Sequence, residues 1–283
     1  MTRPTSNQRP VYISPDWMRC TQGMAFALRP PDSLLSPAAL TSSNLWERTA
    51  SVTLHAQAGN FAHVERLIEI IQDADDWHLR DCAVRIFALA APSSILGELT
   101  KVYEHADYDT RIEAYTATRL TGDLSLAVAL ARHRSKAPRS ERDRIMDNVS
   151  DILEADMDDL ELAESNLDDA AYVRRVEEKV AELRTHYRDT KFFLNGEPLG
   201  AIKVAETIAR LCAEEEPELR GGRIANLFSI LEGMTGASYV GCLDDDCEPV
   251  MPKISAALNK LRQSGVLEKL EPGVRYFFGH RSP

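Results

Sequence analysis

The carboxylates between residues 145 and 173 are the most concentrated chemical groups of the chain. This stretch holds ten acidic side chains and no Lys or Arg. General acid–base catalysis needs a carboxyl group whose pKa is raised in a pocket, whereas a solvated acidic face keeps its carboxylates ionised. We therefore expect this stretch to bind a basic partner rather than to catalyse a reaction. The partner-binding residues that we predict are Asp151, Glu154, Asp156, Asp158, Asp159, Glu161, Glu164, Asp168 and Asp169.

Cys242 and Cys247 enclose three aspartates, and such a group can be a metal site or a redox pair. Their C-x4-C spacing is followed by no second Cys/His pair at zinc-finger distance, and His280 is a remote candidate for a third ligand. An acidic loop with one partly buried thiol is the alternative, and we favour it. Neither acidic run has the glycine and glutamate that an EF-hand loop requires. We expect no bound metal and no cofactor.

Motifs of nucleotide-binding and hydrolytic enzymes are missing from the sequence. It has no GxxxxGK[ST] phosphate-binding loop, no GxGxxG after a strand and no GxSxG turn. The seven histidines are scattered, and none belongs to an HExxH motif. We therefore predict that the protein is not an enzyme.

A spacing of 31 residues runs through the region that must position the acidic groups. Trp46, Trp77 and Tyr108 follow one another at this interval, and Arg139 occupies the next step. The same interval relates three arginines, which are Arg80, Arg111 and Arg142. We expect the aromatic side chains to lie in the core, and a ladder of exposed aromatic residues that binds a partner is the alternative.

A second amphipathic stretch follows each of the first three repeat segments. In the first, Phe61, Val64, Leu67 and Ile68 recur at helical spacing, and turn-forming residues such as Gly59 separate the stretches. Two helices in every repeat predict an α-solenoid of helical hairpins, in which stacking buries the apolar faces. The pattern, with an aromatic residue at the start of the first helix and an arginine within it, resembles HEAT-like repeats. We assign these repeats to residues 45–190, including the acidic segment 145–173.

The region before the repeats, residues 1–44, holds six of the fourteen prolines. Proline has no amide donor and disfavours helix interiors. We expect an irregular N-terminal arm, packed in part through Trp17, Met24 and Phe26. A disordered tail is the alternative.

The region after the repeats, residues 191–283, is predicted as a C-terminal helical module. Apolar spacing indicates three helices, and a small terminal β-hairpin is expected from residues 266–270 and 274–278 around Glu271-Pro272-Gly273. The module is either winged-helix-like or a cap on the solenoid. The predicted fold class of the whole chain is therefore all-α in the main.

The repeats, the acidic balance and segments of the C-terminal module together resemble the immunity proteins of bacterial polymorphic toxin systems. The C-terminal segments are AETIARLCAEEEPELRGG, SILEGMTGASYVGC and RYFFGHR. The resemblance implies a cytoplasmic antitoxin without catalysis that binds one cognate toxin, and it assigns no functional residue. A nuclease would fit as the toxin, because an acidic surface can occupy the groove that nucleic acid uses.

The net charge of −11, from 33 basic and 44 acidic residues, disfavours general nucleic-acid binding and favours a basic protein partner. A DNA-binding regulator is the alternative function, because residues 250–283 carry six Lys or Arg against two Glu. A HEAT-like DNA glycosylase is a further possibility, but it would need a basic concave face, whereas these repeats end in an acidic run. The five cysteines are odd in number and sparse, which predicts reduced thiols in a cytoplasmic protein. No apolar run approaches the length of a membrane span, so we expect no membrane partner.

Overall fold

A computed structural model describes residues 8–19, 23–155, 162, 166–188, 190–214 and 221–283. Within these ranges the chain is mainly α-helical with two small two-stranded sheets, and this confirms the predicted fold class. None of the helices described is both long enough and apolar enough to cross a membrane.

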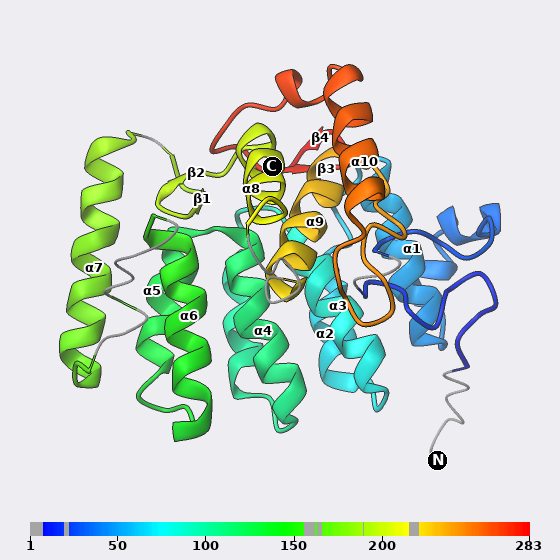
Figure 1. The fold of residues 1–283 in the computed structure, drawn as a ribbon. Coiled ribbons are helices and arrows are strands. Elements are labelled where there is room, and N and C mark those ends of the chain that lie inside the picture. The colour runs from blue at the N-terminus through cyan, green and yellow to red at the C-terminus, as the bar shows by residue number, and fades with distance from the viewer. Residues whose placement is uncertain (1–7, 20–22, 156–161, 163–165, 189, 215–220) are drawn as a thin grey trace, which may run out of the picture.

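In the described part of the chain, four helical hairpins stand side by side (Figure 1). Their first helices are α1 (Leu45–Gln57), α3 (Trp77–Ala90), α4 (Tyr108–Thr121) and α6 (Arg142–Leu153). Their second helices are α2 (Arg66–Asp73), the 3-10 helix η3 (Leu96–Glu104), α5 (Leu124–His133) and α7 (Asp169–His186). Within each row, neighbouring helices are in contact, which is the arrangement of an α-solenoid.

The residues that cap the repeat helices explain why the three equally spaced aromatic residues differ in burial. The side chains of Asn44, Asp76 and Asp107 accept hydrogen bonds from backbone N–H groups in the first turns of α1, α3 and α4. The first two caps are one residue further apart than the aromatic interval, and one residue turns a helix by about 100°. Trp46 is therefore buried, whereas Trp77 is 49% exposed and Tyr108 is 48% exposed. The prediction that all three lie in the core is wrong for Trp77 and Tyr108.

The C-terminal region forms helices α8 (Ala201–Leu211), α9 (Gly221–Thr235) and α10 (Met251–Gln263), as the apolar spacing predicted. Helix α9 packs on α8 and contacts both α3 and α4, so it lies across the row of first helices. A short hairpin precedes these helices and joins β1 (Phe193–Leu194) to β2 (Glu197–Pro198) through the turn Asn195-Gly196.

The terminal hairpin is present, but its predicted position is wrong. Strands β3 (Tyr276–Phe277) and β4 (His280–Arg281) pair around Phe278 and Gly279, which both have positive φ angles. Such a two-residue turn normally contains Asn or Gly at its first position, and therefore Phe278 gave no turn signal. The first expected strand is instead the 3-10 helix η6 (Leu267–Lys269), which packs against α8.

The N-terminal arm and the terminal hairpin both pack against α3. The arm contains two short 3-10 helices, η1 (Asp32–Leu35) and η2 (Ala39–Thr41), and it buries Trp17 and Met24. The carbonyl oxygen of Trp17 accepts a hydrogen bond from His78 Nε2 at 2.9 Å. One continuous apolar core therefore contains residues of the arm, the repeats and the C-terminal helices.

Candidate functional site

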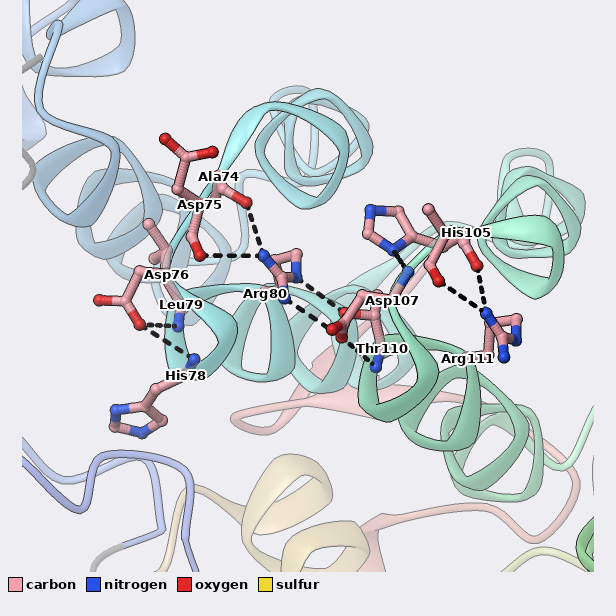
Figure 2. Close-up of polar contacts among 11 residues, drawn as sticks. Ala74, Asp75, Asp76, His78, Leu79, Arg80, His105, Asp107, Thr110 and Arg111 are labelled. Carbon is pink, nitrogen blue, oxygen red and sulfur yellow. Dashed lines mark hydrogen bonds and ion pairs between the residues drawn. The ribbon is translucent and has the colours of Figure 1, made fainter. Parts of the chain in front are cut away.

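The repeat arginines connect consecutive helical hairpins (Figure 2). Arg80 Nη1 donates to the carbonyl oxygens of Ala74 at 2.8 Å and Asp75 at 3.2 Å, in the turn before its own helix. Its Nε donates to Thr110 Oγ1, and its Nη2 lies 3.1 Å from Asp107 Oδ2 in the next repeat. The Arg80 guanidinium thus stabilises the turn before α3 and also links α3 to the start of α4.

Arg111 repeats this arrangement one hairpin later. Its Nη1 donates to the carbonyl oxygens of His105 and Ala106, and its Nε and Nη2 reach the carboxylate of Glu141. Glu141 is 1% exposed and also accepts a hydrogen bond from the Tyr115 hydroxyl. Arg80 and Arg111, which are 31 residues apart, therefore each link one repeat to the next.

The predicted partner-binding residues at the end of α6 have intramolecular partners. Asp151 forms an ion pair with Arg119 of α4. Glu154 is buried, and it accepts hydrogen bonds from the Ser150 hydroxyl and from the backbone N–H of Leu162. Both carboxylates therefore stabilise the fold around α6.

The described residues at the start of α7 are likewise engaged. Asp168 is exposed and caps the helix by accepting from the backbone N–H of Ala171, while Asp169 lies 2.6 Å from Arg134 Nη1. The remaining predicted partner-binding residues lie outside the described ranges, and they are Asp156, Asp158, Asp159, Glu161 and Glu164.

A cavity of about 590 Å³ lies where the N-terminal arm, α3, α4, α9 and the loop at residues 245–247 meet. We call it the acidic cavity because four carboxyl groups and two guanidinium groups line it. The carboxyl groups belong to Asp16, Asp81, Glu113 and Asp245, and the guanidinium groups to Arg19 and Arg85. The lining also includes the apolar side chains of Trp17, Met18 and Ala225.

Both guanidinium groups of the acidic cavity are already engaged. Arg85 Nε lies 2.6 Å from Glu113 Oε1, and both side chains are at least 80% buried. The Arg19 guanidinium lies 5.0 Å from the centre of the exposed Trp77 ring, and it also lies 3.7 Å from Asp16. Asp81 and Asp245 form no ion pair among the residues described, and of these two it is Asp81 that lies on α3, close to Glu113.

The environment of Asp81 disfavours its ionised form. Its Oδ1 atom is buried and makes no hydrogen bond within the described part of the chain. Burial raises the pKa of Asp81 to about 7, and the nearby Glu113 carboxylate acts in the same direction, while Arg85 opposes it. Burial also raises the pKa of Glu113, against the effect of Arg85. A cation that entered between these groups would favour ionisation of Asp81 and pair with it.

The other titratable groups of the acidic cavity do not form a nucleophile and its base. Cys82 Sγ donates to the Trp17 carbonyl oxygen, and burial raises the pKa of its thiol well above the usual value. Burial also lowers the pKa of His78, whose Nε2 is bound to the same carbonyl oxygen. Nucleophilic catalysis requires an activated thiolate or hydroxyl beside a base. Among the described residues, Cys82 and His78 do not form such a pair.

The cysteines at 242 and 247 do not act together. Cys242 is a buried free thiol, whereas Cys247 is disulfide-bonded. The reduced state predicted for the thiols is thus wrong for Cys247. Within the residues that the structure describes, no three His, Cys, Asp or Glu side chains are grouped so that they could hold a metal ion.

Sequence reasoning missed Asp81 and Glu113 because neither belongs to a run of acidic residues. A usable signal was present in the segment RDCAVRIFALA, where Asp81 and Arg85 occupy positions i and i+4 among apolar residues. Charged residues at that spacing lie on one face of a helix, and a charged face inside a buried helix must find partners. Comparisons with protein-family models, curated proteins and solved structures find no match to this chain.

Proposed function

We propose that the protein is a non-enzymatic immunity protein that binds and neutralises a basic toxin domain. The observation that carries the proposal is the acidic cavity, where Asp81, whose Oδ1 atom is buried, forms no ion pair among the described residues and lies near Glu113. A lysine or arginine side chain of the partner would supply the missing positive charge. Its pairing with Asp81 would be charge-assisted and shielded from solvent, which favours tight and specific binding.

The charge of the whole chain supports the same proposal. A net charge of −11 attracts a basic domain over several ångströms and accelerates its association. A nuclease toxin has the basic surface that this requires, since it must itself bind phosphates. The acidic segment 145–173 remains part of the proposed binding surface through its five members outside the described residues.

A DNA-binding regulator is the alternative that the basic C-terminal residues raised. Arg275, one of those residues, is buried and donates to the carbonyl oxygens of Ala88 and Ala91. The hairpin that would serve as a wing packs against α9 and α3. Because a wing must be free to enter a groove of DNA, this geometry favours the protein-binding proposal.

The test is calorimetry of the protein with the product of the neighbouring gene, supported by co-expression of the two. A one-to-one complex of nanomolar affinity and rescue of growth are expected. Asp81→Asn should weaken binding about tenfold or more, since it removes the charge that pairs with the partner. Asp73→Asn, at the exposed end of α2, is the matched control and should leave the affinity unchanged. A complex that tolerates Asp81→Asn would exclude the acidic cavity from the interface.

The acidic segment is tested separately by reversing its charge at Asp156, Asp158 and Asp159. If these residues face the partner, the association rate at low salt should fall while the dissociation rate changes less. An unchanged association rate would remove the segment from the proposed surface.

A further inference from the structure

A second hollow lies between the start of α8 and η6, two elements that are in contact. We call it the apolar groove, and its volume is about 590 Å³. Its apolar side chains come from both elements and from the turns beside them, and they include Ile202, Leu267, Leu270 and Pro272. The apolar groove shares no lining residue with the acidic cavity.

Ile202 is the unusual residue of this groove. It lies in the first turn of α8, and 46% of its side chain is exposed, whereas Leu267 and Leu270 beside it are buried. An aliphatic side chain left half exposed at the opening of a hollow offers apolar area to a partner. The groove can therefore receive an aliphatic side chain of another molecule.

Carboxylates surround this apolar floor. Glu197, Glu206, Glu268 and Glu271 line the groove with one ammonium group, that of Lys203. Lys203 lies 2.9 Å from Glu197 and is neutralised by it. Glu206, Glu268 and Glu271 are exposed and form no ion pair among the described residues. The rim is therefore negative, and it is complementary to a segment that carries Lys or Arg.

We propose that the apolar groove is a docking site for a protein segment in which an aliphatic side chain is flanked by Lys or Arg. The aliphatic group would cover Ile202, and the cations would pair with Glu206, Glu268 and Glu271. Recognition of this kind combines an apolar anchor with charges that set its orientation. The inference rests on the groove alone and does not require the proposed immunity function.

Fluorescence anisotropy with the full-length protein tests the proposal. The probe is a labelled peptide of about eight residues that alternates lysine and leucine. A lysine–serine peptide controls for charge, and a glutamate–leucine peptide controls for the apolar side chains. We expect the lysine–leucine peptide to bind at least about tenfold more tightly than either control peptide. Equal binding of the lysine–serine peptide would reduce the effect to general charge attraction and overturn the proposal, as would no binding of the lysine–leucine peptide.

Two variants locate the binding. Ile202→Asp should weaken binding at least about tenfold, although the added carboxylate increases the attraction for a cationic peptide, so a loss must come from apolar contact. Val240→Asp is the matched control, because Val240 is also 46% exposed and lies outside the groove. Circular dichroism checks that both variants fold. If Ile202→Asp binds as tightly as Val240→Asp, the peptide docks elsewhere and the proposal is wrong.

Discussion

A single carboxyl group links the acidic cavity to the stability of the protein. Because the pKa of Asp81 rises from its usual value near 4 to about 7, the native state retains a proton that the unfolded chain releases between those values. The free energy of unfolding therefore falls as the pH rises from about 4 to about 7, and the loss persists above pH 7. Asp81→Asn should remove this loss, and it should raise the free energy of unfolding at pH 8 by about 1–2 kcal/mol.

Urea denaturation of both proteins at pH 3.5, 6 and 8 measures this effect. The stabilisation by Asp81→Asn should vanish at pH 3.5, where Asp81 is protonated in both states. Glu232, whose pKa burial raises to about 8, gives the same pH trend in both proteins, so only their difference reports on Asp81. A difference that does not change with pH would mean that Asp81 ionises normally.

Two glycines separate the effect of backbone conformation from that of close packing. Gly122 and Gly265 have nearly equal positive φ angles of 65° and 66°. A Cβ atom on Gly122 would lie 2.4 Å from the Phe193 carbonyl oxygen, whereas one on Gly265 meets no atom within 4 Å. Gly265→Ala should cost about 1 kcal/mol from conformation alone. Gly122→Ala should cost at least about 2 kcal/mol more, measured by urea denaturation, because its Cβ would also clash with the Phe193 carbonyl oxygen.

At the scale of elements, the ion pairs between repeats differ sharply in burial. Arg111 and Glu141 form a buried pair between α4 and the start of α6, and Lys136 and Glu104 form an exposed one. Glu141→Ala should lower the free energy of unfolding by about 3 kcal/mol, since it leaves a buried guanidinium with fewer partners. Glu104→Ala is the control, and its denaturation midpoint should equal that of the wild type. Similar midpoints for both variants would show that the repeats are held by apolar packing alone.

The same scale shows what the sequence could predict. The apolar spacing is a local property, and it predicted the helices of the repeats and of the C-terminal module. The Asn195-Gly196 turn has residue types that suit its positive φ angles. The position of the last hairpin and the exposure of Trp77 were not predictable in this way. Phe278 adopts a turn conformation that its residue type disfavours, and the cap before α1 shifts the register by one residue.

The candidate site was harder to predict than the elements. Asp81 and Glu113 meet because α3 packs directly on α4, and Asp245 reaches the same cavity from a loop that is distant in the sequence. The acidic segment, in contrast, was conspicuous in the sequence. Its described members at Asp151, Glu154 and Asp169 nevertheless bind groups of the same chain. The density of acidic residues in the sequence thus did not show which carboxylates would pair with groups of the same chain in the folded protein.

At the scale of the whole molecule, the C-terminal residues couple the end of α3 to the terminal hairpin. The backbone N–H of Ser93, after α3, donates to the carbonyl oxygen of Pro283 at 2.8 Å. Arg275 donates to the carbonyl oxygens of Ala88 and Ala91, and burial lowers its pKa to about 10. Solenoid repeats otherwise depend mainly on their nearest neighbours. Contacts between residues so distant in sequence should make α3 and the C-terminal hairpin unfold together.

Arg275→Ala tests this coupling. The variant leaves two buried carbonyl oxygens with fewer donors, and it should lower the free energy of unfolding by about 2–4 kcal/mol. Hydrogen exchange should show lost protection in β3, β4 and the end of α3, while α6 and α7 stay protected, because neither α6 nor α7 contacts the hairpin among the principal helix contacts. Arg262→Ala, at an exposed arginine of α10, should change neither quantity. Equal loss of protection in all four hairpins would instead mean that the solenoid and its flanking segments unfold as one unit.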